Sequence, residues 1–230
     1  MLRSIEPEWL DALKASDPRA RRSRRELRLI NFIMGNAGSV ARALGNMLAD
    51  GARIVDLGAG DGTLMLRVAR KIRPRPVRVE LVLVDRASAI SAETIARFRG
   101  LQWNATPLAA DAIEWLQRAP AGFDVITANL FLHHFEPRAL LQLLLLVSAR
   151  TRVFIACEPR RSRFALAASR VLGLAGCGPE TRHDAAVSVR AGFRGDELSQ
   201  AWPATQDWEL QEGPAGLFNH LFVARQHEAV

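Results

Sequence analysis

The spacing of hydrophobic residues divides the chain into three zones. In residues 1–50, apolar residues recur at helical spacing in "PEWLDALKA" and "RELRLINFIMGN", and a further short helix is expected over 37–49. From about 53 to 159, near-continuous apolar runs alternate with helical patterns. Residues 160–205 break this alternation, and the final "DWELQEGPAGLFNHLFVARQ" predicts two strands about a turn.

The alternating zone predicts a parallel sheet with helices on both faces. We expect its strands in "RIVDLG", "VELVLVD", "FDVITAN" and "RVFIACE", with a weaker one in "LQWNATPLAAD". Strands that are covered on both faces are apolar almost throughout, as these are. With the terminal hairpin added, the prediction is an α/β fold with a doubly wound, mostly parallel seven-stranded sheet and an antiparallel C-terminal hairpin.

The break in this alternation predicts extra structure between the fifth strand and the hairpin. There "RSRFALAASRVLGLAG" predicts a helix, "CGPETRHDAAVSVRAGF" a loop and "GDELSQAW" a short helix. The predicted organisation is therefore an N-terminal helical lid over 1–50 and a main domain over 51–230. An insert on the substrate side occupies 160–205.

Composition narrows the class of protein. The chain has 230 residues, 49% of them hydrophobic, which is enough for one full core. No apolar run reaches the ~20 residues of a membrane span. The N-terminal sequence also lacks the apolar region of a secretory signal. The two cysteines have neither disulfide nor metal-ligand spacing. We therefore expect a cytoplasmic protein without a metal site, and no feature fixes its oligomeric state.

Charge adds one further feature. The formal net charge is +7, and "DPRARRSRRELR" places six arginines between Asp17 and Arg28. Such a cluster can bind nucleic acid or anionic lipid, or it can form a solvated helix face whose arginines pair with acidic groups. The second interpretation is favoured, because no aromatic residues alternate with the arginines as a single-strand binding surface requires.

Three glycines follow the first predicted strand, in "RIVDLGAGDGTLMLRVARKI". Gly58, Gly60 and Gly62 lie between a strand and a helix, where the absence of Cβ lets a ligand approach the backbone. The following helix offers free N–H groups. No Lys-Ser/Thr pair follows, which excludes a P-loop. The turn indicates a nucleotide site but does not distinguish between nucleotides.

Carboxylates at successive strand ends make that distinction. Asp56 lies two residues before the first glycine, where it would repel a pyrophosphate but attract an amino or sulfonium group. Asp85 ends the next strand and can accept hydrogen bonds from ribose hydroxyls. Asp111 follows the third strand, where it can meet an adenine amino group. Each could instead be a helix N-cap, but three in succession favour a cofactor site.

The segments "VDLGAGDG", "LVLVD", "AAD" and "FDVITANLFLHHF" resemble the successive motifs of class I S-adenosylmethionine-dependent methyltransferases. The resemblance covers about residues 53–159 and the terminal hairpin. It implies a Rossmann-like methyltransferase fold, with the methionine moiety at Asp56 and the glycine turn, the ribose at Asp85 and the adenine at Asp111 and Ala112. The full implied cofactor site is Asp56, Gly58, Ala59, Gly60, Asp85, Arg86, Asp111, Ala112 and Asn129.

Two adjacent histidines are the candidate catalytic residues. His133 and His134 follow the fourth strand, at the sheet edge where doubly wound folds bind substrates. A histidine titrates near neutral pH and can accept a phenol or hydroxyl proton. Because neighbouring residues do not share a helix face, only one of the two is expected to point into the site. Glu158, at the end of the fifth strand, is expected to bind an N-terminal arginine or to touch the substrate.

The acceptor is inferred from what the fourth-strand motif resembles. "LFLHHF" resembles small-molecule O- and C-methyltransferases, whereas the Asn/Asp-Pro-Pro-aromatic motif for methylating exocyclic nitrogens of bases is absent. The leading hypothesis is an enzyme that methylates an oxygen of a small phenolic, quinone or polyketide-type molecule. Two alternatives stay open. One is an RNA methyltransferase that uses the arginine-rich segment, and the other is a binding module that keeps the cofactor fold without turnover.

Overall fold

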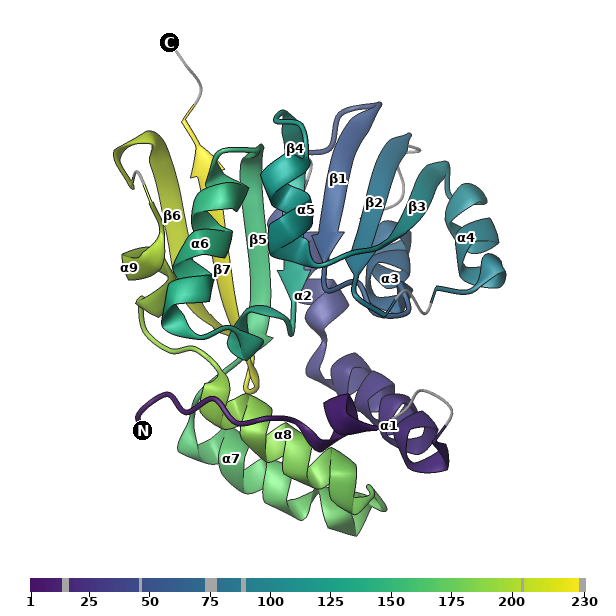
Figure 1. Cartoon of the computed structure of the whole chain (residues 1–230), viewed down its shortest axis with the longest axis vertical. Helices are drawn as coiled ribbons and strands as arrows, with labels where there is room; N and C mark the ends of the chain where they lie inside the picture. Colours follow the sequence, from purple (N-terminus) through teal and green to yellow (C-terminus); the bar gives the residue numbers. More distant parts are fainter. Residues whose placement is uncertain (14–16, 46, 73–77, 88–89, 204, 228–230) are drawn as a thin grey trace.

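A seven-stranded sheet forms the centre of the protein (Figure 1). The computed structural model describes residues 1–13, 17–45, 47–72, 78–87, 90–203 and 205–227. The strands are β1 (Ala52–Leu57), β2 (Val79–Asp85), β3 (Trp103–Ala109), β4 (Phe123–Asn129), β5 (Thr151–Pro159), β6 (Trp208–Ala215) and β7 (Asn219–Gln226). They lie in the order β3-β2-β1-β4-β5-β7-β6.

The pairing of the strands confirms the predicted topology. The first five strands are parallel, and β7 runs antiparallel both to β5 and to β6. The order reverses between β1 and β4, where the two halves of a doubly wound sheet diverge and leave a crevice at their carboxyl ends. The weak third strand is also confirmed, as the edge strand of the sheet.

Helices cover both faces of the sheet and give each face its own core. The helices α2 (Asn36–Leu44), α3 (Thr63–Ile72) and α4 (Ala92–Arg99) pack on one face. On the other lie α5 (Ala112–Arg118), α6 (Pro137–Ser148) and α9 (Glu197–Ala201). Strand residues such as Ile54 and Val55 point to opposite cores and are both fully buried. This two-sided burial is why the strands are apolar at nearly every position.

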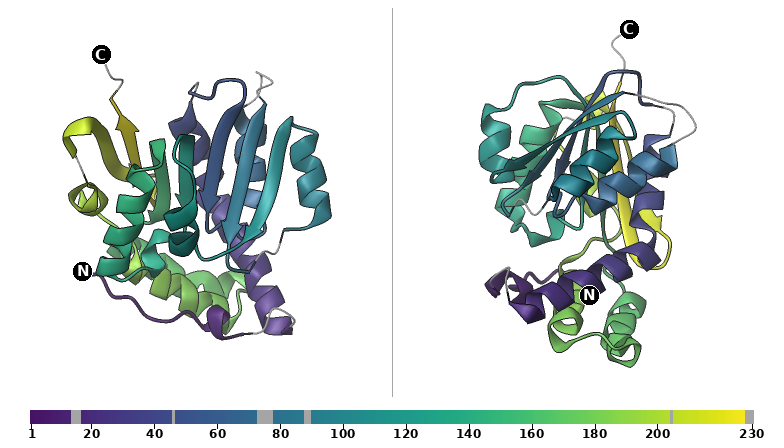
Figure 2. Two further views of the ribbon diagram at one scale, coloured as in Figure 1. Left: turned by 45° about the horizontal axis from the view of Figure 1, so that its top comes forward. Right: turned by 90° about the vertical axis from the view of Figure 1, so that its right-hand side faces the viewer.

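A separate layer of helices lies beyond the carboxyl ends of the parallel strands (Figures 1 and 2). It consists of the 3₁₀ turn η1 (Trp9–Ala12), α1 (Pro18–Met34), α7 (Arg163–Arg170), the 3₁₀ turn η3 (Val171–Ala175) and α8 (Pro179–Ala191). We call this group the end layer. It joins the two segments that the sequence analysis assigned to a lid and to an insert, although they lie about 150 residues apart in the chain.

Two expectations about helices were wrong. The stretch predicted as a loop contains α8, whose buried residues Thr181, Asp184, Val187 and Ala191 share one face. Two of these four are polar, so the helix carries no apolar stripe that the hydrophobic pattern could reveal. The helix expected over 37–49 is α2, which ends at Leu44 because Gly45 follows with a positive φ.

The remaining short elements are the 3₁₀ turns η2 (Leu132–His134) and η4 (Thr205–Asp207). Among the residues that the structure describes, no helix has the length and apolar character to cross a membrane.

Candidate active site

The turn between β1 and α3 leaves its backbone open at the sheet edge. Gly58 and Gly60 have φ values of +71° and +56°, which side chains disfavour. At Gly58 an added Cβ would also lie 2.4 Å from the ring of Phe131. The N–H groups of Gly58 and Ala59 donate to the carbonyl of Val84, which fixes the turn against β2.

Asp85, at the end of β2, folds back toward this turn. Its carboxylate accepts hydrogen bonds from the N–H groups of Gly60 and Ala87, each at 2.9 Å. It caps no helix, since α4 begins only at Ala92 with Ser91 as its cap. The N-cap alternative therefore does not account for Asp85.

Asp111 is a helix cap and a cavity residue at once. One carboxylate oxygen accepts hydrogen bonds from Ile113 and Glu114 as the N-cap of α5. The other oxygen pairs with the guanidinium of Arg86. Burial raises the pKa of Asp111, but the Glu114 N–H and the Arg86 guanidinium outweigh it and hold that pKa below its usual value. The N-cap alternative thus holds for Asp111, which keeps one oxygen on the cavity side with Arg86.

Asp56 is the most deeply buried of the predicted cofactor carboxylates. Its side chain lies beneath the glycine turn at 2% exposure, and the Thr127 hydroxyl donates to it at 2.7 Å. Burial raises the pKa of Asp56 to about 7, although the hydrogen bond from Thr127 opposes this. A buried carboxyl group with a raised pKa favours a cationic partner, because a nearby positive charge stabilises the ionised form.

Two cavities adjoin at the carboxyl ends of the strands. The larger, of about 710 Å³, lies at the ends of β2 and β3. The smaller, of about 480 Å³, lies between the sheet edge and the end layer. Gly58, Glu8, His133 and His134 line both. The larger cavity is also lined by Asp85, Arg86, Asp111 and Ala112, and the smaller by Asp56, Ala59, Gly60 and Asn129. Every residue predicted for the cofactor therefore lines one cavity or the other.

Asn129 connects the sheet edge to the end layer. It is the last residue of β4, and its amide oxygen accepts a hydrogen bond of 3.0 Å from the side chain of Asn36. Asn36 is fully buried at the start of α2, directly after the Gly35 cap of α1. This contact ties the end of α1 to the fourth strand.

His133 is held in place by a buried carboxylate. Glu158, fully buried at the end of β5, accepts hydrogen bonds from the N–H groups of Phe131, Leu132 and His133. It also lies 2.8 Å from His133 Nδ1. Burial lowers the pKa of His133, but hydrogen bonds and charge from Glu158 and Glu8 outweigh it and raise the pKa to about 9. The imidazole therefore carries its proton at neutral pH.

Of the two roles expected for Glu158, binding an N-terminal arginine was wrong. It does not bind an N-terminal arginine, because backbone N–H groups and His133 take up both of its oxygens. Arg3, which does reach this region, donates instead to the carbonyls of His133 and Phe135. The sequence places Glu158 at the strand end, but it gives no sign that the neighbouring turn would fold over it.

Both histidines reach the cavities, contrary to the expectation for neighbouring residues. Their rings lie 4.1 Å apart at the centroids, and both line the two cavities. They belong to the one-turn 3₁₀ element η2 rather than to an α-helix, so the argument from helix faces does not apply. His133 is buried, whereas His134 is exposed.

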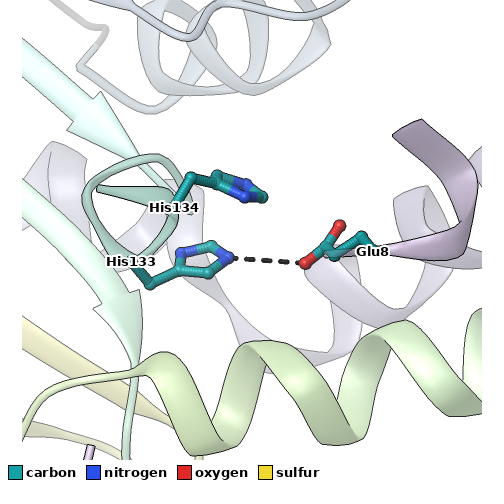
Figure 3. A group of neighbouring side chains, drawn as sticks. All are labelled: Glu8, His133 and His134. Atoms are coloured by element: carbon teal, nitrogen blue, oxygen red, sulfur yellow. Dashed lines mark ion pairs between the residues drawn. The ribbon is translucent and has the colours of Figure 1, made fainter. Parts of the chain in front are cut away.

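Glu8 completes this group from the N-terminal segment (Figure 3). Its Oε1 lies 3.7 Å from His133 Nε2 and also accepts a hydrogen bond from the hydroxyl of Ser188 on α8. One side-chain atom each of Glu8, His133 and His134 lies within 4.8 Å of the others, close enough to contact one bound group or to hold a metal ion. Sequence reasoning missed Glu8, because its role depends on its contact with His133, which lies 125 positions later in the chain.

Other candidate residues have structural roles. Asp184 accepts hydrogen bonds from the backbone of Trp9 and Leu10, and His183 stacks on the Trp9 ring. Both therefore hold the N-terminal segment against α8. His220 lies in β7 and pairs with Glu212. Cys157 is buried within β5, and burial raises the pKa of its thiol.

Comparison with known proteins now gives this site a context. Residues 54–152 match the family model described as "Methyltransferase domain". No curated protein matches the chain by sequence. Among solved structures, the mitomycin 7-O-methyltransferase MmcR is 19% identical with a TM-score of 0.61. That alignment covers 95% of this chain and 60% of the other.

Two further structures are similar in the same way. The plantazolicin methyltransferase BamL, solved with a desmethylPZN analogue and SAH, is 13% identical with a TM-score of 0.63 and 93% coverage of both chains. The pyocyanin biosynthetic protein PhzM is 16% identical with a TM-score of 0.63, covering 96% of this chain and 62% of its own. This chain thus spans about three fifths of two of these relatives, and the likeness shows a shared fold.

Proposed function

We propose that the chain is an S-adenosylmethionine-dependent methyltransferase and that it methylates an oxygen of a small phenolic, quinone or polyketide-type acceptor. The main support is the meeting of the two cavities beside Glu8 and His133. One carries the carboxylates that a nucleoside requires. The other is lined by Asp56 and Asn129 at the sheet edge and by aliphatic side chains of α1, α7 and α8 in the end layer, which suit an aromatic acceptor.

The cofactor, when bound, supplies a methyl group on a positively charged sulfonium. Asp56 and the backbone of Gly58 and Gly60 would hold its amino-acid end, since the carboxyl group of Asp56 is buried without a cation among the described residues. Asp85 would accept the ribose hydroxyls. Asp111 and Ala112, with Arg86 beside them, would meet the adenine, and Asn129 would line the cofactor site in the smaller cavity, with Asp56.

His133 would stabilise the acceptor as an oxyanion. A phenol has a pKa near 10, close to the value of about 9 for His133, so a proton can be shared between the two at little cost. The positive charge of the imidazolium would lower the pKa of a bound phenol, so that the phenol loses its proton to solvent more readily and remains as phenolate beside the imidazolium. Glu158 would act as a positioning residue, because it holds Nδ1 and leaves Nε2 toward the cavity. His134 would line the acceptor side.

The end layer would close over the reacting groups. The N-terminal segment crosses α8 and is held there by Asp184 and Ser188 (Figure 1). Together with α1 and α7 it covers the smaller cavity. Exclusion of water by such a cover would strengthen the pairing of imidazolium and phenolate. We therefore propose that the part of residues 1–50 that belongs to the end layer forms a lid and that 160–205 builds the acceptor side.

The acceptor class can be tested directly. The protein is incubated with cofactor carrying a radiolabelled methyl group and with cell extract, which is then separated into RNA, protein and small-molecule fractions. We expect label in the small-molecule fraction, in a product from which alkali does not release it, as for an aryl ether. Label in RNA would support the alternative use of the arginine-rich segment. The absence of label together with tight cofactor binding would favour the non-catalytic alternative.

A further inference from the structure

The positive charge of the protein is concentrated in two segments of the end layer. Helix α1 carries six arginines and one glutamate, and the stretch 163–175 of α7 and η3 carries two arginines and no acidic residue. The net charge of these two segments therefore equals the +7 of the whole chain. All the other residues together are balanced in charge.

Only part of this charge is neutralised within the protein. Arg19, Arg22 and Arg28 pair with carboxylates. Arg21 and Arg25 are exposed, and no ion pair involves them among the described residues. The sequence-based interpretation of a solvated helix face with paired arginines therefore leaves Arg21 and Arg25 unexplained.

The same two segments expose large hydrophobic side chains. On α1, Leu29 and Ile33 are 60% and 70% exposed, and Phe32 lies between them. In the second segment Leu174 is 92% exposed, and Phe164 and Val171 are also exposed. Isolated exposed hydrophobic residues need no explanation, but a group of six on two neighbouring elements does. The two segments touch, since Arg22 donates to the carbonyl of Gly176 directly after η3.

This surface borders the mouth of the smaller cavity. Ile30 and Ile33 of α1 and Ala168 and Leu172 of the second segment line that cavity. Neighbouring residues on the same elements face solvent. We call the exposed residues of the two segments the rim: Arg21, Arg25, Leu29, Phe32, Ile33, Phe164, Arg170, Val171 and Leu174.

We propose that the rim binds the surface of an anionic lipid bilayer. Arginines beside leucine, phenylalanine and isoleucine are the composition that inserts into the boundary between lipid headgroups and acyl chains. A nucleic acid would pair with the arginines but would leave Leu29 and Leu174 uncovered. The cavity mouth would then face the bilayer, and an apolar acceptor, if that part of the proposed function holds, could reach the site from the lipid.

Vesicle binding tests the surface without any acceptor. The protein is sedimented with vesicles of phosphatidylcholine alone and of phosphatidylcholine with roughly 30% phosphatidylserine, an anionic lipid that attracts polybasic segments. We expect binding to the anionic vesicles that weakens as salt is added. Each arginine near the surface contributes roughly fivefold in affinity, so R21E/R25E is expected to lose ~25-fold or more.

Matched variants separate the rim from the general surface. L29S/L174S is expected to weaken vesicle binding by about tenfold or more, whereas L141S/L145S, on exposed positions of α6, should not change it. R99E/R118E repeats the charge change on exposed positions of α4 and α5 and should cost less than R21E/R25E. Each variant must retain S-adenosylhomocysteine binding, which shows that it is folded and that the proposed cofactor site is intact.

Several outcomes would overturn the proposal. Equal loss in the control and rim variants would show that binding is not localised. Binding to an RNA or single-stranded DNA oligonucleotide but not to vesicles would assign the rim to nucleic acid. A dimer in sedimentation that L29S/L174S dissociates, without vesicle binding, would assign it to a second copy of the chain. None of these results depends on whether methyl transfer is observed.

Discussion

The sheet edge and the end layer meet at the same cavities but are stabilised differently. At the edge, the groups are fixed by backbone: Asp85 accepts N–H groups of Gly60 and Ala87, and Glu158 accepts three from the η2 turn. In the end layer, separate segments are joined mainly by side chains, as when Asp184 holds the backbone of Trp9. We therefore expect the edge to be the more rigid region and the end layer to separate from it more readily.

The largest effect is expected from removing the imidazole at the edge. H133N should lower the rate of methyl transfer by about 10² to 10⁴-fold, the usual contribution of a group that manages the acceptor proton. Cofactor affinity should stay within about twofold. The matched change in the end layer, H183N, removes a ring that stacks on Trp9 and should cost only a few-fold in rate. Rates are measured with saturating labelled cofactor and an acceptor from the fractionation experiment.

Equal rates in H133N and H183N would exclude the proposed role of His133. A drop in H133N accompanied by loss of cofactor affinity would instead assign the residue to the structure of the cofactor site.

Two carboxylates that each accept several hydrogen bonds allow a comparison of stability. E158Q should lower the free energy of unfolding by about 3 to 5 kcal/mol, because it breaks a buried pair and leaves N–H groups poorly satisfied. Glu26 on α1 accepts from Gly178, Thr181 and Arg22 near the surface, and E26Q should cost about 1 kcal/mol. Urea unfolding followed by fluorescence measures both. Similar losses would show that the end layer is as rigid as the edge.

Cofactor affinity distinguishes the regions in another way. D85A should weaken S-adenosylhomocysteine binding by roughly 10 to 100-fold, since it removes a charged hydrogen-bond acceptor. D184N, which loosens the N-terminal segment instead, should change affinity by no more than about twofold. Calorimetry gives both values, and an unchanged affinity in D85A would refute the ribose assignment.

The smallest effect is expected from pH. Because the folded pKa of Asp56 is raised to about 7 from 3.8, its contribution to stability is present below pH 3.8 and is lost as pH rises through 7. A bound ammonium group favours the ionised form, so cofactor affinity should rise roughly tenfold between pH 6 and pH 8. D56N should remove this dependence. A wild-type affinity that is flat over this range would mean that Asp56 does not face the cofactor's amino group.

The features that the sequence predicted are those with a local pattern. Apolar runs identified the strands, and the glycine spacing identified the turn whose Gly58 leaves no room for a Cβ. The features that it missed depend on contacts between distant residues. Helix α8 buries Thr181 and Asp184 rather than an apolar stripe, and Glu8 enters the site only because α8 holds its segment there.

The long separation between the N-terminal segment and its partners has a consequence for how the protein matures. Trp9 is synthesised 175 residues before Asp184, whose carboxylate accepts a hydrogen bond from the Trp9 N–H. For most of translation α8, which holds Glu8 in place, has therefore not yet been synthesised, whereas the first four parallel strands can already pair. The nascent chain would therefore form the crevice proposed for the nucleoside well before Glu8 and His133, the proposed catalytic group, come together.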